Sequence, residues 1–187
     1  MTNNLPIITI PLEQLSSRVS IVQKTLRPLV HCNNEMEVPC KLLPKKQDGG
    51  KVIAAHGKIT RLEDYRDWKF RTLAKDIWCQ YFEIWKPTND EKEFYLFRAY
   101  LHLFQTDRST HSMKEFVCVH CDPEEVQNRY KQGPHLHIKN AEEPIPQCHF
   151  PLNYCNLDTV LYSIDTLTES IEKAIEILTV EVVNRYI

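Results

Sequence analysis

The chain has 187 residues, of which 42% are hydrophobic and 26% are charged. This size and composition predict one domain over residues 1–187 with one hydrophobic core, and they exclude disordered, collagen-like and low-complexity proteins. No apolar run of about 18 residues occurs and no basic, apolar leader opens the sequence, so we expect no membrane contact and no secretion. Seven cysteines, an odd number, fit reduced thiols and a cytoplasmic location.

The formal net charge of −2 hides an uneven distribution. Residues 1–75 carry 13 Lys and Arg against 7 Asp and Glu, whereas residues 76–187 carry 10 against 18. Ten of the cations lie between residues 41 and 75. A basic segment can bind phosphates or an acidic partner, and it is also typical of a solvated surface. Within it Lys69 and Arg71, and later in the chain Lys139, are the candidate substrate-binding cations.

The first part of the chain predicts a helix followed by a loop. A short apolar stretch at 5–10 precedes Pro11, which suits the first position of a helix. Apolar residues then recur at spacings of three and four up to Pro28, as on the buried face of a helix. Turn-forming residues predict a loop at 31–50, residues 51–59 predict a strand, and 62–75 is compatible with a helix. We therefore expect residues 1–60 to be a helix-plus-loop extension of a body formed by residues 61–187.

The remainder predicts a sheet closed by a helix. Aromatic and β-branched residues predict strands at 77–86, 94–106, 114–121 and 135–139, with one or two helical turns at 124–131. A capping box at Thr166 and Glu169 opens an amphipathic C-terminal helix. The predicted fold class is α+β: an antiparallel β-meander of about four to five strands, with N-terminal and C-terminal helices packed on one face.

Alternation along the predicted strands separates two faces. The residues expected to face the core are Tyr95, Phe97, Ala99, Leu101, Leu103, Val117, Val119, Leu136 and Ile138. The residues expected on the opposite face are Phe94, Leu96, Arg98, Tyr100, His102, Phe104, Phe116, Cys118, His120, His135 and His137. Because a shift of one residue would move a whole set to the other face, this grouping depends on the register. It predicts a site rich in histidine.

Histidine suits acid–base chemistry, since its reference pKa of about 6.5 leaves both protonation states available near neutrality. Two histidines can act as base and acid when an RNA 2′-hydroxyl attacks its phosphate, without metal and without any cofactor. We assign these roles to His135 and His137, with Arg98 stabilising phosphoryl charge and Tyr100 orienting a group. His102 and His120 complete the candidate catalytic set. A solvated polar sheet face accounts for the same residues equally well.

A metal site is the competing chemical interpretation. His135 and His137 project from the same side of a strand, and Glu142 or His149 could complete a three-ligand set. A structural zinc site built on Cys118 and Cys121 is disfavoured, because residues three apart on a strand point to opposite faces. Glycine-rich phosphate loops and a Gly-x-Ser-x-Gly turn do not occur in the sequence, which argues against NTPases, dinucleotide enzymes and ordinary serine hydrolases.

The order of motifs resembles the TumE family, small bacterial toxins of two-gene toxin–antitoxin systems. An aromatic hairpin leads to Leu96-Phe-Arg98, then to Gly-Pro-His-Leu-His-Ile at 133–138, and an amphipathic helix beginning Asp-Thr-Leu-Thr-Glu-Ser-Ile-Glu at 165–172 follows. The resemblance covers residues 77–180. It implies a toxin that acts on RNA, held by an antitoxin-like protein partner, with the catalytic role at His135 and His137.

The leading interpretation is a toxin-like or phage-defence-associated ribonuclease, and two alternatives to it remain open. One is a non-catalytic binding or assembly module of a bacterial defence or regulatory complex, in which the basic segment and an aromatic sheet face form the contact surface. The aromatic residues of that face would be Trp78, Trp85, Phe94 and Phe104. The other is a metal-dependent hydrolase with a His-x-His site.

Overall fold

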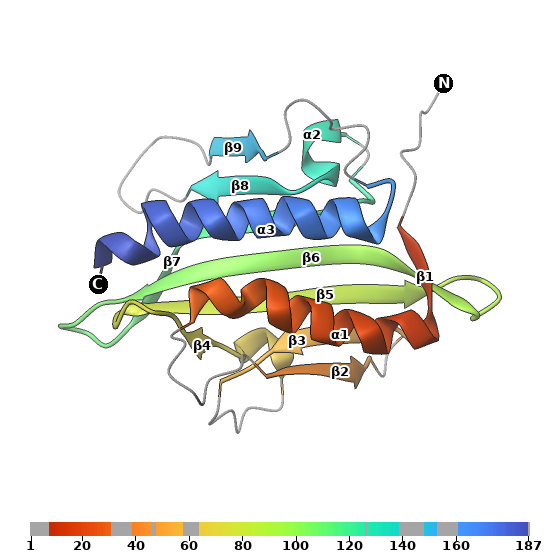
Figure 1. Cartoon of the computed structure of the whole chain (residues 1–187), viewed down its shortest axis with the longest axis horizontal. Coiled ribbons are helices and arrows are strands. Elements are labelled where there is room, and N and C mark those ends of the chain that lie inside the picture. Colours follow the sequence, from red (N-terminus) through yellow and green to blue (C-terminus); the bar gives the residue numbers. More distant parts are fainter. Residues whose placement is uncertain are drawn as a thin grey trace.

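The computed structural model describes residues 8–30, 39–45, 48–57, 64–125, 127–138, 148–152 and 161–186. The α+β class is confirmed, but the antiparallel sheet has nine strands rather than four to five (Figure 1). Seven of them lie in the order β2-β3-β5-β6-β7-β8-β9, while β1 pairs with β6 and β4 pairs with β5. The strands are β1 (Thr9–Pro11), β2 (Cys40–Pro44), β3 (Lys51–Ala55), β4 (Phe70–Arg71), β5 (Ile77–Pro87), β6 (Glu93–Thr106), β7 (Met113–Cys121), β8 (His135–Ile138) and β9 (Cys148–Pro151).

The long strands β5, β6 and β7 are those that the sequence pattern predicts, and the additional strands are short. β1, β4 and β9 span only two to four residues, too few to show alternation. β2 lies inside the predicted loop at 31–50. It was not predicted as a strand because prolines stand at both of its ends. The segment 62–75 contains β4 and a 3₁₀ turn at Tyr65–Asp67 instead of a helix. Because β2 and β3 extend the same sheet, residues before position 60 contribute to the common core.

Two long helices cover one face of the sheet (Figure 1). Helix α1 (Leu12–Leu26) begins after Pro11 as predicted and continues into a 3₁₀ turn at Arg27–Leu29. Helix α3 (Ile164–Glu181) begins earlier than predicted, because its N-cap is Ser163. The Ser163 side chain accepts a hydrogen bond from the Thr166 amide, and the Thr166 hydroxyl accepts one from the Ser163 amide. Helix α2 (Arg129–Gln132) is a single turn between β7 and β8.

A β-bulge in β6 corrects the predicted division of faces. Ile84 pairs with Arg98 and Trp85 pairs with Leu96, so Phe97 is an extra residue in β6. The bulge reverses the alternation, and the core residues of β6 are therefore Phe94, Leu96, Ala99, Leu101 and Leu103. The predicted core positions Tyr95 and Phe97 are wrong: neither belongs to the core cluster, and Phe97 packs on the opposite face.

A second bulge changes the face assignments of β7. Leu103 pairs with Val117 and Phe104 with Glu115, so Phe116 is the extra residue and packs against the core rather than on the histidine face. In β8, Ile138 is 46% exposed and lies outside the core, contrary to the prediction.

Two of the four aromatic residues predicted to form a contact face are not on the surface of the sheet. Trp85 and Phe94 are buried in the core beneath the helices. Only Trp78 and Phe104 remain half-buried, and they are register partners on the face away from the helices.

A buried charged network links both helices to the sheet on the core side. Arg18 of α1 donates from its NH2 group to Oε1 of Glu83 at 2.7 Å, and both side chains are almost fully buried. The Tyr81 hydroxyl donates to the same carboxylate at 2.6 Å and the Trp85 indole at 3.0 Å. Arg18 also donates to the hydroxyl of Thr168 in α3.

Among the described residues, no helix has the length and apolar character to cross a membrane.

Candidate functional site

Four histidines lie on neighbouring strands, on the face of the sheet away from the helices. One register row joins Tyr100 of β6 to His120 of β7 and His135 of β8. The next row on the same face joins His102 to Cys118 and His137. The predicted collection of histidines on one face is therefore present, because the strand segments that carry them lie between the two bulges.

The imidazole rings contact one another. The ring centroids of His120 and His137 lie 4.4 Å apart, those of His135 and His137 4.7 Å, and those of His102 and His120 5.0 Å. Tyr100 stacks on His120 with a centroid distance of 4.0 Å and an interplanar angle of 21°. The rings form one continuous cluster across three strands.

This cluster is buried rather than solvated. His135 is 0% exposed and His137 is 7% exposed, which differs from the polar wet face considered as an alternative. Burial, together with the neighbouring His102, His137 and His135, lowers the pKa of His120 to about 3. His120 is therefore a neutral imidazole at pH 7.

One member of the cluster has an acidic neighbour. Nδ1 of His102 lies 3.2 Å from a carboxylate oxygen of Glu115. Sequence reasoning missed Glu115 because strict alternation from Val117 places it on the core side, whereas the bulge at Phe116 brings it to the histidine face.

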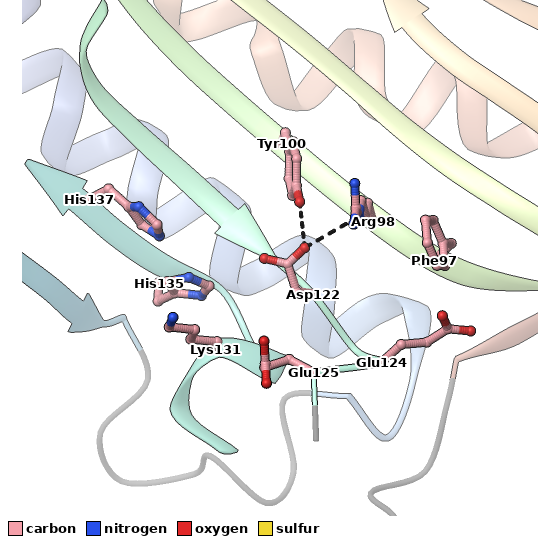
Figure 2. A pocket seen from close by; sticks show the side chains of 9 residues that line it. All are labelled: Phe97, Arg98, Tyr100, Asp122, Glu124, Glu125, Lys131, His135 and His137. Carbon is pink, nitrogen blue, oxygen red and sulfur yellow. Dashed lines mark hydrogen bonds and ion pairs between the residues drawn. The ribbon is translucent and has the colours of Figure 1, made fainter. Parts of the chain in front are cut away.

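A cleft of about 420 Å³ opens beside the histidines. Figure 2 shows its lining residues: Phe97, Arg98, Tyr100, Asp122, Glu124, Glu125, Lys131, His135 and His137. The structure thus brings four predicted site residues into one cleft, while His102 and His120 lie outside its lining. The acidic residues and Lys131 were missed, and they belong to the connection between β7 and β8, where no periodic pattern assigns them to a face.

Asp122 organises the end of the cleft nearest β6 (Figure 2). The Tyr100 hydroxyl donates a hydrogen bond to Oδ1 of Asp122 at 2.5 Å, and Nε of Arg98 lies 3.6 Å from the same oxygen. Burial and this hydrogen bond raise the pKa of Tyr100 well above its usual range, so its phenol stays protonated. Arg98 remains about half exposed to the cleft.

Two overlapping groups of side chains have the spacing of metal ligands. The ligand atoms of His120, His135 and His137 all lie within 4.8 Å of one another, and so do those of His102, Cys118 and His120. Of the ligands predicted from the sequence, Glu142 lies outside the described residues. His149 is the register partner of His137 in β9, but its side chain is outside the described part.

The cysteines do not form the disfavoured zinc site within the described residues. Cys118 lies in the histidine row, whereas Cys121 belongs to the core cluster, so the two thiols are on opposite faces as predicted. Neither cysteine forms a disulfide within the described part of the chain.

The predicted substrate-binding cations lie near the other end of the histidine face. The Lys69 amine is 4.8 Å from the ring centroid of Phe104, and the Arg71 guanidinium is 5.2 Å from that of Trp78. Neither cation lines the cleft. Lys139 lies outside the described residues.

Scans of protein-family models, of curated proteins and of solved structures find no match for this chain. The assignment of a function therefore depends on the chemistry of the cleft.

Proposed function

We propose that the chain cleaves phosphodiester bonds of RNA in the cleft between β6, β8 and the connection after β7. The observation that carries this proposal is that His135 and His137 line the same cleft as Arg98. Transesterification of RNA requires groups that accept and donate protons. It also requires a cation that stabilises the charge on the phosphoryl oxygens.

In the proposed reaction, the 2′-hydroxyl loses its proton and its oxygen bonds to phosphorus. The bond from phosphorus to the 5′-oxygen then breaks, and that oxygen takes up a proton. The products are a 2′,3′-cyclic phosphate and a 5′-hydroxyl. His135 and His137 act as the base and the acid in these proton transfers. The guanidinium of Arg98 stabilises the charge that develops on the phosphoryl oxygens.

Cation–aromatic pairs supply a surface for the flanking nucleotides. Lys69 with Phe104, and Arg71 with Trp78, combine a positive charge with a ring on which a base can stack. This combination favours single-stranded RNA over a neutral substrate. The relation to the TumE family, the toxin role, the cytoplasmic location and the antitoxin-like partner stay predictions from the sequence.

The test is cleavage of a fluorescently labelled single-stranded RNA by the wild type and by His135→Gln and His137→Gln. We expect each variant to lose activity by about a hundredfold or more, as for the loss of a group that moves protons. His111→Gln, at an exposed turn between β6 and β7, is the matched control and should retain the wild-type rate. A 2′-O-methyl RNA of the same sequence should resist cleavage.

Absence of cleavage by the wild type, or equal rates for the wild type and both variants, would contradict the proposal. RNA retained by the protein without turnover would instead support the binding-module alternative.

A further inference from the structure

We propose that His120, His135 and His137 bind one transition-metal ion of the zinc class at the inner end of the cleft. This inference depends on the proposed function only for the use that is made of the ion, since binding itself requires no RNA.

The strand register brings the three imidazoles together. His120 is the direct register partner of His135, and His137 follows two residues later on the same face of β8. Their ligand nitrogens lie within 4.8 Å of one another. A tetrahedral ion with Zn–N bonds of about 2.0–2.1 Å holds its nitrogens about 3.4 Å apart. Coordination would therefore require the rings to rotate so that their nitrogens approach one another by up to about 1.4 Å.

The environment of two ligands favours metal binding. Nδ1 of His135 lies 2.9 Å from the carbonyl oxygen of Gly133, which can only accept, so Nδ1 carries the proton. In the neutral ring Nε2 is then the unprotonated nitrogen, which is the one that can coordinate an ion, and this backbone contact is the usual second contact of a metal-bound histidine. Nε2 of His120 is buried and has no hydrogen-bond partner among the described residues. A buried polar atom of this kind is satisfied by coordination.

The donor set indicates which ion binds. Three imidazole nitrogens suit zinc, copper, nickel or iron, whereas magnesium and calcium require oxygen ligands. Three protein ligands would leave a fourth position for water or substrate, and two of the ligands, His135 and His137, line the cleft. An ion held there would lower the pKa of a bound water and polarise a phosphoryl oxygen.

This site differs from both earlier expectations. With the ion bound, metal-assisted chemistry would take the place of the proton transfers proposed for the imidazoles of His135 and His137 in the metal-free protein, in contrast to the predicted metal-independent mechanism without a cofactor. It also takes His120, rather than Glu142 or His149, as its third ligand.

The test is a titration of the full chain, stripped with a chelator, with cobalt(II), followed by its visible absorption and by competition with zinc. We expect one ion per chain, and at least a tenfold weaker affinity in His120→Gln and in His137→Gln. His56→Gln is the matched control, because this half-buried imidazole packs edge-on against Trp68 away from the cluster, and it should bind as the wild type does. His102→Gln separates the two ligand groups and should also retain binding.

Wild-type protein that binds neither cobalt nor zinc would overturn the proposal. Loss of binding in His102→Gln together with full binding in His137→Gln would do the same, because the ion would then belong to the group with Cys118. Circular dichroism of each variant shows whether the fold is intact. Weaker binding in both His120→Gln and His137→Gln shows that the loss does not come from misfolding of one variant.

The same samples separate this proposal from the proposed function. Metal binding without RNA cleavage supports the metal site and contradicts the ribonuclease. Cleavage that persists in EDTA, by protein that binds no metal, supports the ribonuclease and overturns the metal site.

Discussion

The two faces of the sheet each bury a polar cluster, and the clusters are built in opposite ways. On the helix side, the carboxylate of Glu83 receives hydrogen bonds from Arg18, Tyr81 and Trp85, so charge and hydrogen-bonding capacity are matched. On the other side, His120 lies among three more imidazoles that lower its pKa instead of stabilising its charged form.

We interpret the Glu83 network as structural and the histidine cluster as a binding site. A buried network with every member paired fixes the positions of the elements that carry it. A group of similar titratable side chains gains nothing from mutual contact and is typical of functional sites. The comparison predicts that changes to the Glu83 network affect folding, whereas changes to the histidine cluster affect binding.

The largest expected effect comes from removing the centre of the paired network. Glu83→Ala leaves the charge of Arg18 buried without its counterion, so we expect a loss of about 3–5 kcal/mol in the free energy of unfolding. Urea denaturation measures it. In the control Glu181→Ala, which removes an exposed ion pair with Arg185, the loss should stay below about 1 kcal/mol. Similar losses in both variants would remove the distinction between the two clusters.

The histidine cluster should instead respond to an added ion. Zinc at a hundred times its dissociation constant should raise the free energy of unfolding of the wild type by about 2.7 kcal/mol, because only the folded state holds the ligands together. Thermal unfolding with and without zinc measures the effect. His137→Gln should show little of it, and an equal shift in this variant would place the ion elsewhere.

Acid should destabilise the metal-free protein through His120. Its pKa is about 3 in the folded state and about 6.5 in the unfolded state, so only the unfolded chain takes up the proton between these values. Stability should therefore be complete above pH 6.5 and fall by at most about 1.4 kcal/mol per pH unit towards pH 3. The titratable groups facing this ring are His102, Cys118, His135, His137, Tyr100 and Glu115.

Carboxylates also contribute to acid unfolding, so the informative quantity is the difference between two pH profiles measured in chelator. His120→Gln removes the titrating ring and should flatten the profile between pH 6.5 and pH 3. Parallel profiles for the wild type and the variant would show that His120 does not contribute.

The smallest effect is expected at the edge of the cleft. Tyr100→Phe removes the hydroxyl that donates to Asp122 and should lower the free energy of unfolding by about 1 kcal/mol. In the RNA assay the same change leaves Arg98 as the remaining partner of Asp122 and should strengthen that ion pair, so substrate affinity should fall while metal binding is retained. A large loss of metal binding would instead make Tyr100 part of the metal site.

The sequence alone predicted the parts of the fold that have a long periodic pattern. Helix α1, helix α3 and the strands β5, β6 and β7 follow from such patterns. It also predicted the shared face of Tyr100, His102, His120, His135 and His137, because alternation holds in the strand segments that carry them.

The missed features have local physical causes. The bulges at Phe97 and Phe116 insert one residue each without any glycine to mark them, so alternation assigned Tyr95 and Phe116 to the wrong faces. The burial of His135 could not be predicted, since its environment depends on long-range packing rather than on its own strand. Asp122 and Lys131 enter the cleft from an irregular connection whose path only the folded chain defines.

The bulge at Phe97 has a consequence for how this gene can change. Deleting that single codon would remove the bulge and leave strict alternation, with Phe94 and Leu96 still towards the helices and Arg98 and Tyr100 still on the opposite face. Deleting Tyr100 instead would turn one half of the strand over and take part of it out of the core. A shorter β6 should therefore be tolerated when the lost residue is Phe97 and not when it is Tyr100.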